Sequence, residues 1–515
     1  MKKRKIVIIG AGAAGLSAAL QAVNEGSEVV LVSSQPSERA QSVMAEGGIN
    51  AAMDTKNEND SPEEHYNDTI NAACGLADPN VVWNMTHSAP DIIRWLMNIG
   101  VQFNRSGFDK VDLRNFGGQK KKRTVFAQSD TGKQLMTAMI DAVRKEEAAG
   151  NVERLSHHSF QTLLLQGNVC LGCLIKDEYS NTVTELHSDA VIIASGGMHG
   201  LFGNTTGSLF NTGEVTAKLF LLGIPIANGE MIQYHPTTIE CGGKRMLITE
   251  AVRAEGGKLF SLKNGKLYYF MRERYPELGD LMPRDITARE IWKERQNSEV
   301  FLDMTDIPDK VIAEKLSGIA ADCMLYLHKD IRKEPVPVSP GIHYFMGGIL
   351  VDEYHRTQIN GLYAAGECCS QYHGANRLGG NSLLGAIYGG RIAAKYACSG
   401  KCNIQKGQPI KADISDDSVT SDIQRLNQIM QNTLGVVRNE ETLQKGLREI
   451  KEMSGSLALL GRAIIESAIA RRESRGAHYR EDYPLRNDRD YLKTTVARFD
   501  GDNIRILFEN VPKRR

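Results

Sequence analysis

The sequence lacks the features that mark several classes of protein. Its nine cysteines are spread over 515 residues without a dense framework, which is typical of a reducing compartment. No run of about 18 apolar residues occurs, so we expect no membrane span. Lys plus Arg and Asp plus Glu both number 62, which argues against bulk-charge binding of nucleic acid or anionic lipid. We therefore expect a cytoplasmic protein, peripheral on a membrane at most.

What is present is an ordinary globular composition, with 41% hydrophobic and 24% charged residues, in a length that suits about three domains. The first part of the chain has a clear order. Residues 5–9 read as a buried strand, residues 16–25 as a helix and residues 28–32 as a second strand. This order predicts a βαβ unit at the start of an α/β domain.

A glycine pattern, Gly10-x-Gly12-x-x-Gly15, lies between the first strand and the helix. The first glycine makes the turn, the second lets the backbone approach a pyrophosphate, and the third lets helix and strand pack. The helix N-terminus adds partial positive charge. The pattern therefore predicts a dinucleotide site. Ser33 ends the second strand where a carboxylate for the ribose hydroxyls is usual, and a serine can accept that hydrogen bond more weakly.

Later segments indicate how the chain is divided. Residues 190–194 form a short apolar run that ends in glycines, and residues 361–366 repeat this pattern. Between them, Asn264-Gly265 is typical of a two-residue hairpin turn and suggests an inserted domain. Residues 400–418 read as a linker, and residues 423–472 return to helix-forming composition.

Motifs along nearly the whole chain resemble the flavoprotein subunits of fumarate reductase and succinate dehydrogenase, a family that also includes L-aspartate oxidase. They occur in the family's order. The segments are 39–49 (RAQSVMAEGGI), 116–123 (FGGQKKKR), 233–237 (QYHPT), 249–257 (TEAVRAEGG), 283–285 (PRD), 343–348 (HYFMGG), 366–367 (GE), 373–384 (HGANRLGGNSLL) and 472–480 (RESRGAHYR).

The resemblance implies FAD as cofactor and an α/β fold of three parts. These are a Rossmann-like FAD-binding domain, an inserted α+β capping domain and a helical C-terminal domain. We place the FAD-binding domain at residues 1–230 and 345–400, the cap at 231–344, a linker at 401–420 and the helical domain at 421–515.

The resemblance also implies which residues contact FAD. Glu214 departs from the family pattern, because it stands in Thr-Gly-Glu-Val where Thr-Gly-Asp-Gly is common. The pattern therefore supports a contact between Glu214 and FAD less than it supports the others. The implied residues are Gly10, Gly12, Ala13, Ala14, Gly15, Ser33, Arg39, Gln41, Ser42, Ala45, Glu46, Gly47, Gly48, Ala194, Ser195, Gly196, Glu214, Glu367, Arg377, Ser382 and Leu383.

Two departures bear on flavin chemistry. Gln41 occupies the position of the histidine that bonds covalently to flavin in membrane-bound members of the family. An amide is not nucleophilic, so we expect non-covalent FAD with a lower potential, which favours fumarate reduction. Glu46 points the same way, since fumarate reductases often have Ala-Glu-Gly-Gly here.

Reduction of fumarate needs a hydride from flavin, a proton, and two groups that hold carboxylates. The resemblance places Arg377 with His343 on one carboxylate and His235 with Thr249 on the other. Arginine suits a bidentate clamp, which lysine does not reproduce. We also expect Phe116, in the FGGQ segment, to contact the substrate.

Arg284 matches the family's proton donor. Glu250 and Arg253 lie three residues apart and resemble the relay that returns a proton to Arg284. Arginine is normally never deprotonated, but a developing carbanion is a far stronger base than water. The alternative is that Arg284 and Glu250 form only a salt bridge across a domain interface.

Three other functions stay open. L-Aspartate oxidase needs an acid for the substrate ammonium, and the loop at residues 115–119 has none, while residues 120–123 are all basic. We read that basic run as a solvated loop. The second alternative is a reductase of another unsaturated acid, because Thr238 and Ile239 could reshape the substrate pocket. The third is a non-catalytic interaction protein that binds flavin.

The chain holds no haem or iron-sulfur motif, so electrons for anaerobic respiration should arrive from an iron-sulfur subunit or a soluble reductant. Cys170 and Cys173 form a C-x-x-C without a second pair or a histidine, which favours a structural role over a metal site. Cys368 and Cys369 follow Glu367, and we assign them no role.

Overall fold

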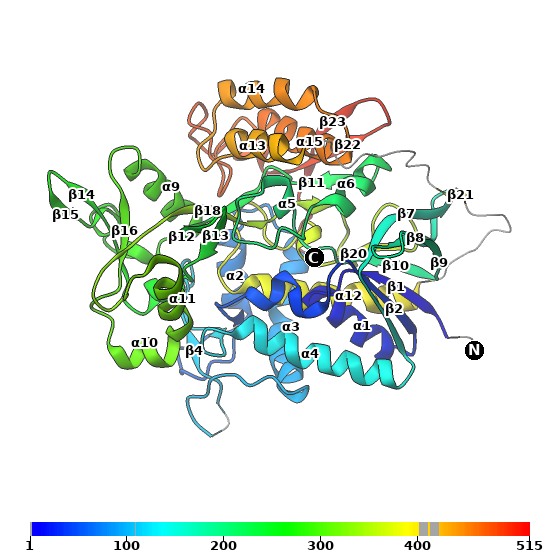
Figure 1. The fold of residues 1–515 in the computed structure, drawn as a ribbon, viewed down its shortest axis with the longest axis horizontal. Helices are drawn as coiled ribbons and strands as arrows, with labels where there is room; N and C mark the ends of the chain where they lie inside the picture. The colour runs from blue at the N-terminus through cyan, green and yellow to red at the C-terminus, as the bar shows by residue number, and fades with distance from the viewer. Residues whose placement is uncertain (1–2, 109, 401–409, 412–421) are drawn as a thin grey trace.

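A parallel sheet lies at the centre of the structure, a computed structural model that describes residues 3–108, 110–400, 410–411 and 422–515 (Figure 1). Its strand order is β20-β10-β1-β2-β6, and every pair is parallel. Apolar runs buried on both faces form these strands, as expected for a parallel sheet, except at the edge strand β6, which is mostly polar and only partly buried. The strands are β1 (Lys5–Ile9), β2 (Glu28–Ser33), β6 (Val152–Ser156), β10 (Ala190–Ile193) and β20 (Leu362–Ala364).

Three long helices pack beside this sheet: α1 (Ala13–Asn24), α4 (Thr131–Ala148) and α12 (Asn381–Ser399). Helix α1 contacts both α4 and α12. A Cβ atom at Gly390 would lie 2.2 Å from the carbonyl oxygen of Ala14, so the close contact of α1 and α12 requires glycine. The sequence-predicted βαβ unit is therefore confirmed.

A second sheet, β21-β7-β8-β9, and a small sheet, β3-β5-β4, complete this part of the chain. Cys170 and Cys173 are buried in β8. The remaining elements here are η1 (Ser37–Arg39), η2 (Gln41–Met44), β3 (Ile49–Asn50), α2 (Pro62–Ala72), α3 (Pro79–Asn98), β4 (Leu113–Arg114), β5 (Thr124–Val125), β7 (His158–Gln166), β8 (Val169–Asp177), β9 (Val183–His187), α5 (His199–Phe202), α6 (Glu214–Leu221) and β21 (Ile410–Lys411).

The inserted segment has its own hydrophobic core, at the left of Figure 1. The predicted hairpin turn is confirmed, since Lys263 pairs with Lys266 and both Asn264 and Gly265 have positive φ. Its sheets are β13-β12-β18 and β15-β14-β16-β17. The elements are β12 (Ile232–Cys241), β13 (Lys244–Leu247), α7 (Ala251–Ala254), β14 (Lys258–Lys263), β15 (Lys266–Tyr268), α8 (Phe270–Arg274), η3 (Gly279–Leu281), α9 (Arg284–Glu294), β16 (Val300–Asp303), α10 (Asp309–Lys315), α11 (Ser317–Leu327), β17 (Val336–Pro337) and β18 (Ser339–Phe345).

The C-terminal part is helical, as predicted, and its helices lie together at the top of Figure 1. It ends in a hairpin that the sequence reading did not single out, and this hairpin joins the sheet β19-β11-β22-β23. Two strands of this sheet, β11 (Ile226–Ala227) and β19 (Gly348–Ile349), come from earlier in the chain, where η4 (Gly366–Cys368) also lies. The C-terminal elements are α13 (Ile423–Thr433), α14 (Glu440–Lys451), α15 (Ser456–Ala470), α16 (Asp488–Tyr491), β22 (Lys493–Phe499) and β23 (Ile504–Asn510).

The α/β fold with an inserted cap and a helical C-terminal domain is thus confirmed, while the exact domain boundaries stay a prediction. Most of the predicted linker at 401–420 lies outside the described residues. Within the described part of the chain, no helix combines the length and apolar character that crossing a bilayer requires.

Candidate active site

Glycines close the turn between β1 and α1. Gly10 has φ of +114°, and a Cβ atom there would lie 2.2 Å from the carbonyl oxygen of Ala194. A Cβ atom on Gly15 would lie 1.8 Å from the carbonyl oxygen of Gly10. Gly12 caps α1 without a side chain, and the amide of Ala13 donates to Ser42 Oγ at 3.2 Å, so the other first-turn amide groups are the ones left for a phosphate.

A cavity of about 790 Å³ extends from this turn to His235 and His343. Its volume lies in the range of ligand pockets, roughly 300–1,000 Å³. An extended cavity with a glycine turn and a helix N-terminus at one end fits a dinucleotide such as FAD. Gly15 supports the turn from behind. The other predicted FAD contacts line the cavity: Gly10, Gly12, Ala13, Ala14, Ser33, Arg39, Gln41, Ser42, Ala45, Glu46, Gly47, Gly48, Ala194, Ser195, Gly196, Glu214, Glu367, Arg377, Ser382 and Leu383.

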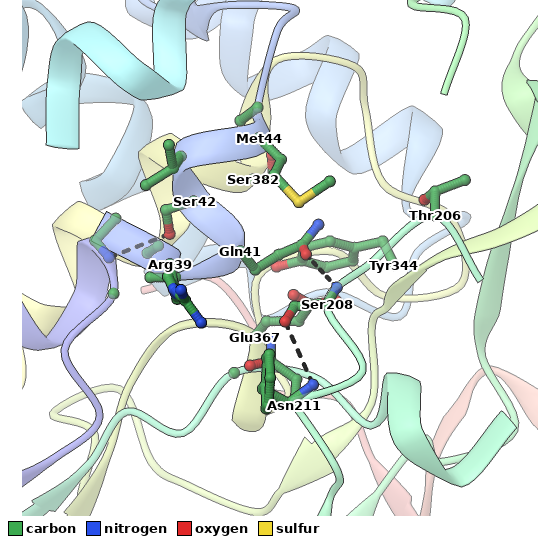
Figure 2. A pocket seen from close by; sticks show the side chains of 18 of the residues that line it. Arg39, Gln41, Ser42, Met44, Thr206, Ser208, Asn211, Tyr344, Glu367 and Ser382 are labelled. Carbon is green, nitrogen blue, oxygen red and sulfur yellow. Dashed lines mark hydrogen bonds between the residues drawn. The ribbon is translucent and has the colours of Figure 1, made fainter. Parts of the chain in front are cut away.

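The middle of the cavity is built by segments that are far apart in the sequence (Figure 2). Gln41 lies on η2, and its side-chain oxygen accepts a hydrogen bond from the amide of Ser208. Glu367, on η4, accepts a hydrogen bond from the amide of Phe345 at 3.1 Å. Glu214 is paired with Lys218 one turn later on α6, at 2.6 Å, so its charge is already balanced within the protein.

At the far end, two histidines and two arginines converge. The pairing of β12 with β18 brings the rings of His235 and His343 to a centroid separation of 5.1 Å. Arg284 begins α9, and Arg377 lies in the loop before α12. Burial first, and then the charge of Arg284, holds the pKa of both histidines well below the usual value. Both rings are therefore neutral near pH 7. Thr249 lines the same end.

Arg377 is a buried cation that lacks an anionic partner. Its side chain is 2% exposed, and no carboxylate of the described residues lies within 4.0 Å of its guanidinium. The guanidinium lies 4.4 Å from the ring centroid of Tyr344, and Nε has no hydrogen-bond partner among the described residues. Burial, followed by the charge of Arg284, lowers the pKa of Arg377 to about 9. A site of this kind favours an anionic ligand.

Arg284 does have a carboxylate partner, behind the cavity wall. Its Nε donates to Glu250 Oε2 at 2.8 Å, and Glu250 Oε1 lies 3.7 Å from Nη2 of Arg253. Burial alone would raise the pKa of Glu250, but the charges of Arg284 and Arg253 overcome it and the net shift is downward. The three residues form one chain of charges. All three belong to the inserted segment, and Glu250 also contacts the FAD-binding part, because its Oε1 accepts a hydrogen bond from the amide of Gly117 at 2.6 Å.

The basic loop at residues 116–123 differs in one respect from the sequence reading. Phe116 lines the cavity, and a Cβ atom on Gly47 would lie 3.0 Å from its ring. Arg123, read as part of a solvated run, is fully buried and paired with Asp60 at 2.8 Å and Asp68 at 2.7 Å. The reason is tertiary, since α2 and the loop before it supply acids that no local pattern reveals.

Several residues at the site were not predicted. Tyr344 lies within the HYFMGG segment, so its motif contained the signal. Gln233 lies within QYHPT. Its side-chain oxygen accepts a hydrogen bond from Arg284 Nη1 at 3.3 Å, and its side-chain nitrogen donates to the carbonyl of Arg377 at 2.8 Å. Thr206 contacts His343, and no motif near it gave a signal.

Comparison with known proteins agrees with this geometry. Residues 5–383 match the FAD binding domain family, and residues 423–459 and 454–514 match the fumarate reductase flavoprotein C-terminal family. The chain is 37% identical to the succinate dehydrogenase flavoprotein subunit of Bacillus subtilis strain 168, over 97% of this chain and 94% of that protein.

Relatives with another activity are similar to a comparable degree. The L-aspartate oxidase of Pyrococcus furiosus is 32% identical over 96% of this chain and 99% of that protein. A solved quinol-fumarate reductase with menaquinol molecules superimposes with a TM-score of 0.89 at 29% identity, over 100% of this chain and 99% of the other. The chain therefore belongs to the fumarate reductase/succinate dehydrogenase flavoprotein family and is an FAD-dependent oxidoreductase.

Proposed function

We propose that this protein interconverts fumarate and succinate and is biased toward fumarate reduction. The observation that carries the proposal is the buried, unpaired cation of Arg377, which faces Arg284 and two neutral histidines in one cavity. A dianionic four-carbon substrate would supply the missing negative charges. Such recognition by planar guanidinium groups is bidentate and favours carboxylates.

Each carboxylate of the substrate would be held by a pair of groups. Arg377 and His343 would hold one carboxylate, and His235 and Thr249 the other. Phe116 closes the wall beside Gly47 and keeps water out. FAD, when bound, supplies the hydride that is added to one alkene carbon. The protein's part is to hold the alkene in place and to provide the proton for the second carbon.

Arg284 would donate that proton. Its Nε contacts Glu250 at 2.8 Å, so its remaining nitrogen atoms are available toward the cavity, and Nη1 is steadied by Gln233 at 3.3 Å. After donation, the Glu250 carboxylate would pass a proton from Arg253 to Arg284, and Arg253 would then be reprotonated from solvent. General acid catalysis of this kind contributes about 10²–10⁴ in rate.

FAD would be held without a covalent bond. Gln41 carries an amide that is not nucleophilic, and its oxygen is already engaged by the backbone of Ser208. Acid precipitation of the purified protein should release all of its flavin into the supernatant. Yellow colour that stays with the washed precipitate would contradict non-covalent binding.

Electrons would be exchanged with a partner. Relatives such as the succinate dehydrogenase of Bacillus subtilis are named as flavoprotein subunits, which supports an iron-sulfur subunit as partner. In that arrangement the protein would act in the cytoplasm, at the membrane face through its partner, in anaerobic electron transport. Purification of the chain at its native expression level tests this assignment, because an iron-sulfur subunit should co-purify with it.

L-Aspartate oxidase is the second candidate, because relatives of that name are 32% and 35% identical to this chain. The acids that contact residues 116–123 are engaged by the protein's own cations and are not available to a substrate ammonium: Asp60 and Asp68 pair with Arg123, Glu58 with Lys122 and Glu250 with Arg284. Purified FAD-loaded protein should reduce fumarate with reduced viologen. Peroxide formation with L-aspartate, without fumarate reduction, would favour the oxidase, and a screen of other unsaturated acids tests the remaining alternative.

Substitution of Arg284 tests the catalytic assignment. Arg284→Ala should lower viologen-linked fumarate reduction by about 10²–10⁴-fold. Arg289→Ala is a matched control on the same helix, since Arg289 stacks on Tyr479 at 4.5 Å and does not line the cavity. Equal activities of Arg284→Ala and wild type would support a flavin-binding interaction protein or a different active site.

A further inference from the structure

Thr206 contacts the back of His343 inside the cavity. Thr206 Oγ1 lies 2.8 Å from Nδ1 of His343, and Thr206 is only 4% exposed. The two residues come from different parts of the chain. Thr206 lies in the loop between α5 and α6, whereas His343 lies near the end of β18. The contact therefore joins the cofactor-binding part to the strand that leaves the inserted segment.

The loop that carries Thr206 is held at several points. The amide of Thr206 donates to the carbonyl of Ile342 at 2.9 Å, next to His343. The amide of Gly207 donates to Thr205 Oγ1 at 3.2 Å, and the amide of Ser208 donates to Gln41. These contacts leave the Thr206 hydroxyl little freedom. Figure 2 shows Thr206 and Ser208 on the same loop, with Gln41 of η2 hydrogen-bonded to Ser208.

The protonation of His343 makes this contact consequential. A neutral imidazole carries one N–H, and the nitrogen without hydrogen is an acceptor. Burial, and then the charges of Arg284 and Arg377, keep the pKa of His343 well below its usual value, so the ring is neutral. A neutral ring can donate to a carboxylate through Nε2 only when Nδ1 carries no hydrogen, and a hydrogen-bond donor at Nδ1 stabilises that tautomer.

We propose that Thr206 is a positioning residue whose hydroxyl donates to Nδ1 of His343 and thereby makes Nε2–H a donor to the substrate carboxylate. The competing acceptor for the hydroxyl is the carbonyl oxygen of Ile342, which lies farther away at 3.4 Å. The proposal rests on the proposed function only in taking a carboxylate as the ligand. The tautomer of His343 is a property of the protein itself.

The first test is dicarboxylate binding by calorimetry, with succinate and oxidised FAD-loaded protein. Thr206→Val keeps the shape and removes the hydroxyl, and it should weaken succinate binding by about ten- to a hundredfold, the value of one hydrogen bond to a charged ligand. Thr206→Ser restores a hydroxyl and should restore binding. Thr86→Val is the matched control, because Thr86 is also buried, its hydroxyl donates to the carbonyl of Trp83 on α3, and it does not line the cavity, so this variant should bind succinate as wild type does.

The second test is 15N NMR of histidine-labelled protein, which reports the tautomer directly. His343, assigned through a His343→Gln variant, should show an unprotonated Nδ1 and a protonated Nε2 in wild type. Thr206→Val should change this signature, and Thr206→Ser should retain it. A protonated Nδ1 in wild type, or wild-type succinate affinity in Thr206→Val, would overturn the proposal. Absence of succinate and fumarate binding in wild type would instead overturn the proposed substrate, and the NMR result would still decide the role of Thr206.

Discussion

Replacement of Arg377 by methionine should make the ligand-free protein more stable and the enzyme inactive. Arg377 is 2% exposed and has no carboxylate partner among the described residues. The fall of its pKa from 12.5 to about 9 corresponds to about 5 kcal/mol of penalty on the charged form, at 1.36 kcal/mol for each pKa unit. Methionine is unbranched like the arginine stem, is shorter and carries no charge.

Part of this penalty is offset in the wild-type protein. The guanidinium lies 4.4 Å from the Tyr344 ring centroid, and a desolvated cation–π contact contributes about 2 kcal/mol. The variant loses that contact when it loses the charge. We therefore expect Arg377→Met to raise the free energy of unfolding by about 3 kcal/mol, within the range known for apolar replacement of buried charges.

The Arg377→Met variant should bind the substrate more weakly. A bidentate clamp makes two charge-assisted hydrogen bonds of about 1.5–3 kcal/mol each, so the KM for fumarate should rise by roughly 10²–10⁴-fold. Urea unfolding of FAD-loaded protein in chloride buffer measures stability, and viologen-linked reduction measures KM. Succinate at 100 times Kd should stabilise wild type by about 2.7 kcal/mol and should leave Arg377→Met unchanged.

A second buried arginine provides the control. Arg471 is fully buried but paired with Glu230 at 2.7 Å and Glu473 at 2.8 Å. Its replacement by methionine removes the cation that pairs with Glu230, while Glu473 keeps Arg475 at 2.7 Å, and should cost about 3–5 kcal/mol. If Arg377→Met were destabilised as much as Arg471→Met, the view of Arg377 as an unpaired charge kept for an anionic substrate would be refuted.

Three further substitutions address the relay, the cofactor region and the basic loop. Glu250→Gln removes the anion between two buried arginines, so it should lower the free energy of unfolding in urea by about 3–5 kcal/mol. It should also lower kcat without raising the KM for fumarate. An unchanged kcat would argue against the relay. Burial raises the pKa of Glu46 from 4.5 to about 8, so FAD-free protein should lose stability as the pH rises from about 5 to about 8. Glu46→Gln should abolish this loss in urea titrations at the two pH values, and persistence of the loss would assign it to another group. Arg123→Met should destabilise the protein by about 3–5 kcal/mol because it leaves two buried aspartates unpaired. Its KM for fumarate should stay at the wild-type value, and a raised KM would instead indicate that the basic loop contacts the substrate.

Much of the fold and of the candidate site follows from the sequence because the relevant signals are local. Gly10 is required by its positive φ and Gly15 by its approach to the carbonyl oxygen of Gly10, so these two requirements lie within one turn and their spacing is visible in the chain. Asn264-Gly265 specifies a hairpin by its own backbone preference. The motifs around His235 and Arg377 likewise identify the residues that the structure brings to one end of the cavity.

Other properties depend on packing between distant segments. Arg123 looks solvated in the chain, yet acids from residues 60 and 68 bury and neutralise it. Thr206 stands in no motif, and it gains a role only because its loop lies against β18. Whether an arginine is paired also depends on its neighbours in space, which is why Arg377 and Arg471 differ although both are buried.

The sequence by itself therefore determined the family, the glycine turn and the identity of the charged residues, since these rest on local backbone requirements and on motifs. The tertiary structure decided which charges are balanced and which are not. Electrostatic energy depends on distance and burial, and neither can be read from spacing along the chain. The burial of Arg123 against two aspartates, the contact between Thr206 and His343, and the lack of an anionic partner for Arg377 among the described residues are features that only the folded protein reveals.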